Sequence, residues 1–154
     1  MATINATVSV NSNDLTSNAL SLSKTMTLTK AGSNVGLELT SGLVRRTFVS
    51  TNHVDLVTAG AQNYGTPTAT KANKIYIKNT GSDSTQYFEV GLGTSSGSGT
   101  PTSDAIGGTH LAIGKLYGGD WMLMPYDGSA TTGDITVTPS TSEKMTVEYI
   151  IFFE

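Results

Sequence analysis

The sequence predicts an all-β fold, an antiparallel β-sandwich or jelly-roll-like arrangement of about ten short strands, in a single domain over residues 1–154. Apolar and polar residues alternate with period two along much of the chain, and no window shows the 3.6-residue spacing of a helix. Thr, Ser and Gly are abundant and favour strands and the turns between them. Charged residues make up 14% of the chain, against about 25% in an average domain. These features together predict a rigid β-module with a neutral, hydroxyl-rich surface.

The first strands are expected near the N-terminus. Residues 4–10 alternate apolar with polar side chains, which predicts a half-buried first strand. The alternation continues over residues 20–28, where Lys24 takes a position that the pattern gives to an apolar residue. A bulge or a strand end near Lys24 would explain that exception. Shorter strands are expected over residues 35–39, 43–49 and 54–57.

The pattern is sharper in the second half of the chain. Strands over residues 74–78 and 87–92 flank a turn at Asn79–Ser82, and this arrangement predicts a hairpin. The Gly- and Ser-rich stretch Gly91–Pro101 is expected to be a surface loop. Further strands are expected over residues 111–113, 121–124 and 135–137.

The segment Thr146–Glu154 (TVEYIIFFE) is the most apolar strand of the chain. One face of this strand carries Val147, Tyr149, Ile151 and Phe153, and the other face carries Ile150 and Phe152. A strand that is apolar on both faces requires cover on both, so it should lie inside a sheet, in the subunit's own core or against a neighbouring subunit. We interpret it as a sign of assembly rather than of chemistry.

Charge and hydropathy limit the classes of partner. The net charge is −3, and no run of basic residues extends beyond Arg45–Arg46, so no direct contact with nucleic acid is expected. No apolar stretch approaches the ~20 residues that span a bilayer, and the first residues do not resemble a secretion signal. We therefore expect a soluble chain with no membrane partner.

No motif predicts catalysis, a cofactor or a metal. The Gly-rich run Gly91–Gly97 lacks the GK[ST] ending of a phosphate-binding loop, and His53 and His110 do not have a metal-ligand spacing. Asp127–Gly128 and Gly133–Asp134 fit turns better than a calcium loop. The expected protein is not an enzyme and has no catalytic, cofactor-binding or metal-binding residues.

A carbohydrate-binding or polysaccharide-degrading domain remains the alternative from another class. Trp121 with Tyr117 and Tyr126 could form an aromatic sugar platform, although packing of Trp121 at a subunit contact or the edge of the core is the favoured interpretation. Two carboxylates could meet in space for glycoside hydrolysis, but no spacing selects a pair. The candidates are Glu38, Glu89, Asp104, Asp120 and Glu148.

Five phrases in the second half of the chain carry a family resemblance. They are IYIKNTG (Ile75–Gly81), YFEVGLG (Tyr87–Gly93), IGKLYGGDWMLMP (Ile113–Pro125), DITVTPS (Asp134–Ser140) and VEYIIFFE (Val147–Glu154). In this order they resemble small structural proteins of tailed bacteriophages, especially cyanophage-like ones, over about half the chain. The resemblance implies a virion β-module on the capsid surface or in the tail, with no enzymatic site.

The expected function is that of a capsid decoration protein that binds across capsid subunits as a homo-oligomer, with a trimer as the expected state. Its partners would be the major capsid protein or other virion proteins, and a tail fibre or adhesin module is the alternative within this class. Weak contacts summed by symmetry would come from exposed aromatic and apolar side chains. The interface candidates are Tyr117, Trp121, Met122, Met124, Tyr126, Tyr149, Ile150 and Phe152.

Overall fold

The computed structural model describes residues 4–14, 20–29, 36–58, 73–93, 111–126 and 134–153. Within these ranges the protein forms strands and no helix, so the predicted all-β class is confirmed. Accordingly, no helix in this part of the chain could cross a membrane. The strands are β1 (Asn5–Ser12), β2 (Leu20–Thr27), β3 (Leu39–Thr40), β4 (Val44–Phe48), β5 (Val54–Val57), β6 (Asn73–Asn79), β7 (Tyr87–Gly93), β8 (Leu111–Tyr117), β9 (Trp121–Tyr126), β10 (Asp134–Pro139) and β11 (Met145–Phe153).

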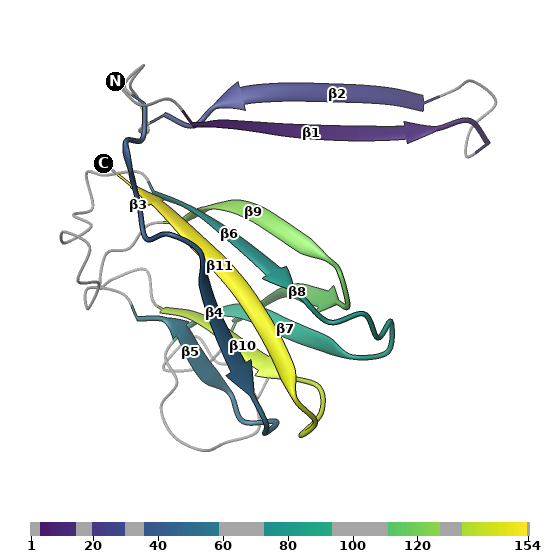
Figure 1. The fold of residues 1–154 in the computed structure, drawn as a ribbon, viewed down its shortest axis with the longest axis vertical. Helices are drawn as coiled ribbons and strands as arrows, with labels where there is room; N and C mark the ends of the chain where they lie inside the picture. The colour runs from purple at the N-terminus through teal and green to yellow at the C-terminus, as the bar shows by residue number, and fades with distance from the viewer. Residues whose placement is uncertain are drawn as a thin grey trace.

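Two antiparallel sheets face each other and form a β-sandwich (Figure 1). In the five-stranded sheet, β11 pairs with β6 along one edge, and β6 pairs with β9. Along its other edge β11 pairs first with β4 and then, at its last residues, with β3. The four-stranded sheet has the order β5-β10-β7-β8. The predicted sandwich is therefore confirmed.

Strands that follow one another in the chain mostly belong to different sheets. From β4 to β11 the chain changes sheet at every connection except the one between β7 and β8, which pair directly. The predicted hairpin of β6 and β7 is therefore wrong: β6 pairs with β9 and β11, whereas β7 pairs with β8 and β10. The turn at Asn79–Ser82 begins the connection that carries the chain from one sheet to the other. Period-two alternation is the same for two strands of one hairpin and for two strands in different sheets, so it does not distinguish them.

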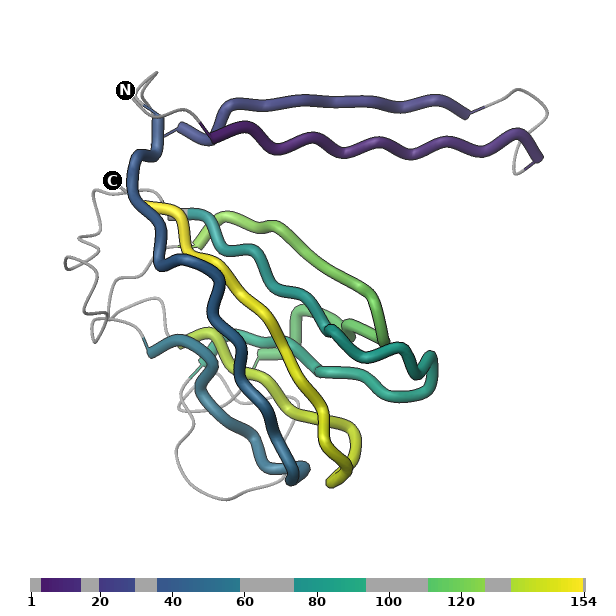
Figure 2. The backbone as a smooth tube through the Cα atoms, in the orientation of Figure 1, coloured from purple at the N-terminus to yellow at the C-terminus, as the bar shows by residue number. Residues whose placement is uncertain are grey.

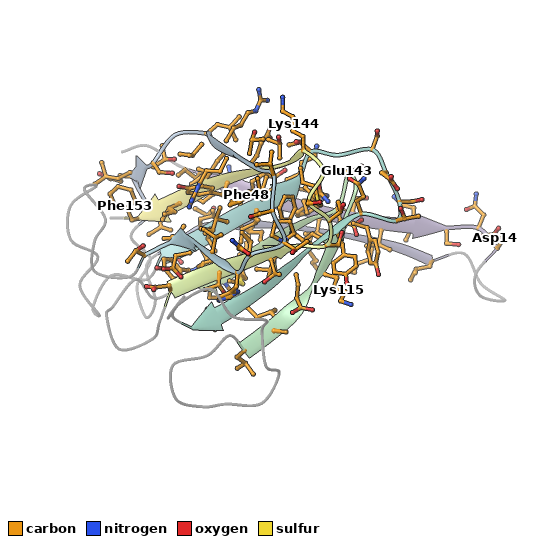
Figure 3. All side chains as sticks on the ribbon, turned by 90° about the horizontal axis from the view of Figure 1, so that it is seen from below. Asp14, Phe48, Lys115, Glu143, Lys144 and Phe153 are labelled. Carbon is orange, nitrogen blue, oxygen red and sulfur yellow. The ribbon has the colours of Figure 1, made fainter. Side chains whose placement is uncertain are left out.

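The core lies between the inner faces of the two sheets. Phe48 from β4 and Phe88 from β7 meet edge to face with their ring centroids 5.7 Å apart, which joins the two sheets through one aromatic contact. In Figure 3, Phe48 lies among the side chains inside the body. The remaining core is aliphatic for the most part: Leu56, Val57, Ile75, Ile77, Val90, Leu116, Tyr126, Ile135, Val137, Met145, Val147, Ile151 and Phe153.

The most apolar strand lies where the sequence predicts. β11 has hydrogen-bonded neighbours on both edges, and its inward face, which includes Val147 and Ile151, is buried in the subunit's own core. Ile150 and Phe152 point to the outer face of the sheet and are half-buried. The prediction that this strand lies inside a sheet is confirmed.

One end of the sandwich is held by a buried side-chain amide. The Asn79 amide nitrogen donates to the Leu116 carbonyl oxygen at 3.0 Å, and its amide oxygen accepts from the Gly81 N–H at 2.9 Å. Nearby, a Cβ at Gly118 would lie 2.5 Å from the Asp83 carbonyl oxygen, so only glycine fits there. These contacts join the turn after β6 to the turn between β8 and β9.

Strands β1 and β2 form a separate two-stranded hairpin, here called the arm, which projects from the body (Figure 2). Asp14 lies at its tip, far from Phe153 in the body (Figure 3). Two expectations about these strands are wrong. β1 is not half-buried, because Val8 and Val10 are exposed, and Lys24 sits in unbroken register opposite Val8 without a bulge.

Candidate interaction site: the arm and the outer face of the five-stranded sheet

The two faces of the arm differ sharply. One face carries only Ser, Thr and Asn, and these side chains bond to one another: Thr7 Oγ1 lies 2.7 Å from Thr25 Oγ1, and Thr27 Oγ1 donates to Asn5 Oδ1 at 2.9 Å. Ser21 donates to Asn11 in the same way. These cross-strand bonds satisfy polar groups along the face, which is therefore suited to water.

The opposite face of the arm is apolar and lacks cover from the described residues. Its large side chains retain between 38% and 51% of their accessible surface: Val8, Val10, Leu20, Leu22 and Met26. Lys24 is the one charged residue among them. An isolated two-stranded hairpin is at best marginally stable in water, so a face of this kind indicates a contact surface.

The base of the arm is buried and hydrogen-bonded to the segment that leads into β3. Leu28 and Leu37 are fully buried, and the Leu37 N–H donates to the Leu28 carbonyl oxygen at 2.9 Å. The Leu28 N–H in turn donates to the Ile4 carbonyl oxygen at 2.8 Å, and Thr29 forms a β-bridge with Gly36. This small hydrogen-bonded patch fixes the direction in which the arm leaves the body.

The outer face of the five-stranded sheet is apolar beneath the base of the arm. Tyr76 and Trp121 lie side by side with ring centroids 6.1 Å apart and planes inclined by 34°. Trp121 keeps 50% of its surface exposed. A groove of about 260 Å³ separates this face from the arm. The groove is lined by Ile4, Asn5, Ala6, Thr7, Val8, Leu28, Tyr76, Trp121, Leu123, Ile150 and Phe152.

Burial and one nearby carboxylate determine the charge state of the groove wall. Glu148 on β11 accepts from Arg45 Nε at 2.6 Å, which forms an ion pair on the same outer face. Partial burial, and secondarily the negative charge of Glu148, raise the pKa of the Tyr76 phenol. Tyr76 therefore stays neutral well above physiological pH, and the wall it forms remains uncharged.

The structure divides the eight interface candidates between three places. Trp121, Ile150 and Phe152 come together at the groove. Tyr117 lies on the outer face of the other sheet, with its ring 5.2 Å from that of Tyr87. Four candidates serve the subunit's own core: Met122, Met124, Tyr126 and Tyr149. The postulated platform of Trp121, Tyr117 and Tyr126 is therefore not assembled, because each of the three rings lies in a different environment.

Sequence reasoning missed most of the site. The alternation predicts a half-buried first strand where the structure has an exposed arm, and it places Tyr76 only within a strand. A signal was present: the face opposite Val8 and Val10 is made of Ser, Thr and Asn alone, while Lys24 interrupts the apolar face. That pattern is typical of an exposed ribbon rather than of a strand in the core.

The carboxylates do not form a catalytic pair in the described part of the chain. Glu89 lies opposite Lys115 on the four-stranded sheet, Glu148 lies on the outer face of the other sheet, and Asp120 accepts from the Tyr117 N–H at 3.0 Å in the β8–β9 turn. Glu38 is exposed just before β3. Asp104 lies outside the described residues, as do residues 127–133, on which the predicted turns at Asp127–Gly128 and Gly133 fall.

Metal ligands are likewise scattered. His53 Nδ1 lies 3.1 Å from Thr138 Oγ1 on the four-stranded sheet, whereas His110 and residues 94–101 of the Gly-rich stretch fall outside the described residues. Among the residues that the structure describes, no group of three or more His, Cys, Asp or Glu side chains could hold a metal ion.

Compared with known proteins, the chain matches no protein-family model and no curated protein sequence.

Proposed function

We propose that this protein is a non-enzymatic virion structural protein, a capsid decoration protein that binds across neighbouring capsid subunits as a homo-oligomer, with a trimer as the expected state. The observation that carries the proposal is the arm, which projects from a well-packed body and exposes large apolar side chains along one face. A surface of this kind favours assembly into the expected homo-oligomer, because covering it removes apolar area from water without any chemistry. The resemblance of the second half of the chain to phage structural proteins supports a phage virion as the place where the protein acts.

The connectivity of the sandwich supports the same proposal. The strand orders β4-β11-β6-β9 and β5-β10-β7-β8 are those of an eight-stranded jelly roll built from two Greek keys, and we infer this fold for the body. Viral capsid domains use the jelly roll, as do lectins. The fold alone therefore selects no function, and the arm is what favours assembly over sugar binding.

The location on the particle can be tested directly. Antibodies raised against the purified protein should label the heads of intact tailed-phage particles from the source lysate in immunogold electron microscopy. Label confined to tails would replace decoration by the tail-fibre or adhesin alternative. Particles that carry no label, from a lysate that contains the protein, would contradict a virion function.

A carbohydrate-binding role is the rival that the Tyr76–Trp121 pair favours, since adjacent aromatic rings can stack on sugar rings. The groove beside this pair is lined mainly by apolar side chains, however, and a sugar needs hydrogen-bonding groups around the ring. We expect the wild-type protein to bind no glycan on an array, and Trp121→Ala to weaken self-association. Glycan binding that Trp121→Ala abolishes while association is unchanged would favour the rival.

A further inference from the structure

Two apolar surfaces of the same chain need cover and face each other only at the base of the arm, where Val8 lines the same groove as Tyr76 and Trp121. The first is the apolar face of the arm, centred on Val10 and Leu22, and the second is the outer sheet face around Tyr76 and Trp121. The arm leaves the body at its base and diverges from the sheet, so the far half of the arm lies beyond reach of its own sheet (Figure 1). The buried, hydrogen-bonded base opposes a swing of the arm that would close the gap.

We propose that the apolar face of the arm docks on the outer face of the five-stranded sheet of a second copy of this chain. Because the two surfaces differ, every arm is docked either in a two-fold dimer that exchanges arms or in a head-to-tail ring, in which each copy gives its arm to one neighbour and receives an arm from the other. The trimer of the proposed function requires the ring. Head-to-tail contacts close into a ring when the rotation between copies permits. The biological role of this contact rests on the proposed function. The physical argument for the contact rests only on the two apolar surfaces.

The size of the surfaces supports a second copy as the occupant. Each arm strand has eight residues, so the arm is about 27 Å long and about 10 Å wide, which gives a planar face of about 270 Å². Covering this face removes about 540 Å² from the two partners together before side-chain relief is counted, which is less than the roughly 1,000 Å² that a specific interface needs. Each copy in a closed assembly makes two such contacts, one through its arm and one through its sheet, and closure holds both at once. The receiving strands β6 and β11 have seven and nine residues, and Tyr76, Ile150 and Phe152 form the apolar part of their outer face.

A partner other than a second copy would cover only one of the two apolar surfaces. A capsid protein bound to the arm would leave Trp121 and the groove exposed to water. A second copy covers both surfaces at every contact and leaves outward only the arm's Ser, Thr and Asn face, whose side chains are already hydrogen-bonded. Ring formation therefore removes both apolar patches at once.

Engineered disulfides test the contact cleanly, because the chain contains no cysteine. Leu22→Cys places a thiol on the apolar face of the arm, and Leu123→Cys places one at the groove. An equal mixture of the two single variants should give a covalent heterodimer on mild oxidation. A chain carrying both substitutions should give covalent rings on a denaturing gel, with the copy number that light scattering finds for the wild type.

Ser23→Cys is the matched control, because Ser23 adjoins Leu22 on the opposite face of the arm. Mixed with Leu123→Cys, it should form no cross-link. If Leu123→Cys fails to fold by circular dichroism, Trp121→Cys takes its place at the more exposed neighbouring position. Leu22→Ser should weaken association at least ~10-fold, since each tenfold change corresponds to about 1.4 kcal/mol and a buried Leu side chain contributes more than that.

Several results would overturn the inference. They are a monomeric wild type at 100 μM (about a hundredfold above a micromolar Kd), a monomeric intrachain disulfide in the double variant, ready cross-linking of Leu22→Cys with itself, or an oligomer without the heterodimer. Because these measurements use the purified chain alone, they are independent of particle labelling. A ring that labels no particle would contradict the proposed function alone, and labelled particles with a monomeric protein would contradict the ring alone.

Discussion

Removal of residues 149–154 is expected to abolish folding. The deletion takes away the second half of β11, which pairs with β6 on one edge and with β3 on the other, so the five-stranded sheet would lose its centre. It also removes five large apolar side chains. At roughly 1.5–3 kcal/mol for each one that is fully buried, the loss approaches the roughly 5–15 kcal/mol that stabilises a typical domain. Far-UV circular dichroism and urea unfolding of the truncated protein measure the outcome.

Two neighbouring isoleucines provide a matched control for this deletion. Ile151 is 3% exposed in the core, whereas Ile150 lies half-buried on the outer face. Ile151→Ala should lower the free energy of unfolding by about 2–5 kcal/mol, and Ile150→Ala by clearly less. A truncated protein that remains soluble and unfolds cooperatively would show that β11 is peripheral, contrary to its place in the sheet.

Phe88→Ala is expected to be the most destabilising of the simple core substitutions. The side chain is 0% exposed and contacts Phe48 across the sandwich, so truncation leaves a cavity where the two sheets meet. The expected loss is about 3–5 kcal/mol in the free energy of unfolding, measured from urea denaturation curves.

Tyr87 is the control for Phe88, because it adjoins Phe88 in β7 but points outward, where Lys115 Nζ lies 4.3 Å from the centre of its ring. Tyr87→Ala should cost about 1 kcal/mol, since it removes only an exposed aromatic contact and a cation–π contact. Equal effects at the two positions would mean that the sheets do not pack through Phe88.

Alternation predicts strands well and their partners poorly. The strand over residues 74–78 appears in the structure as β6, one residue longer at each end, and the strand over residues 135–137 appears as β10, twice as long as expected. The pairing of β6 with β7 was wrong because the chain crosses between sheets at that turn, and a residue's preference for an inner face does not say to which sheet the face belongs. Contacts between segments that are distant in the sequence decide to which sheet each strand belongs. The alternation pattern of a single sequence does not reveal those contacts.

The site was harder to predict than the fold for a related reason. Alternation in β1 is as regular as in β6, yet Ile75 is buried and Val10 is exposed. The same alternation occurs in a strand that packs in the subunit's own core and in a strand whose apolar face is exposed for contact with another surface. The prediction for β11 was correct because apolar residues occur on both of its faces, a condition that an exposed strand does not satisfy.

The central place of β11 has a consequence for the time at which the protein can fold. Glu148 on β11 and Arg45 on β4 are bonded neighbours but lie 103 residues apart in the chain. At synthesis rates of about 5–20 residues per second, β4 waits for roughly 5–20 s before β11 emerges to pair with it. The arm joins segments close in sequence and can form in microseconds. During synthesis the arm can therefore form and reopen many times while the body is still an open chain, because an isolated hairpin is only marginally stable. The binding element is sampled before the domain that carries it exists, and it is fixed when its base is buried.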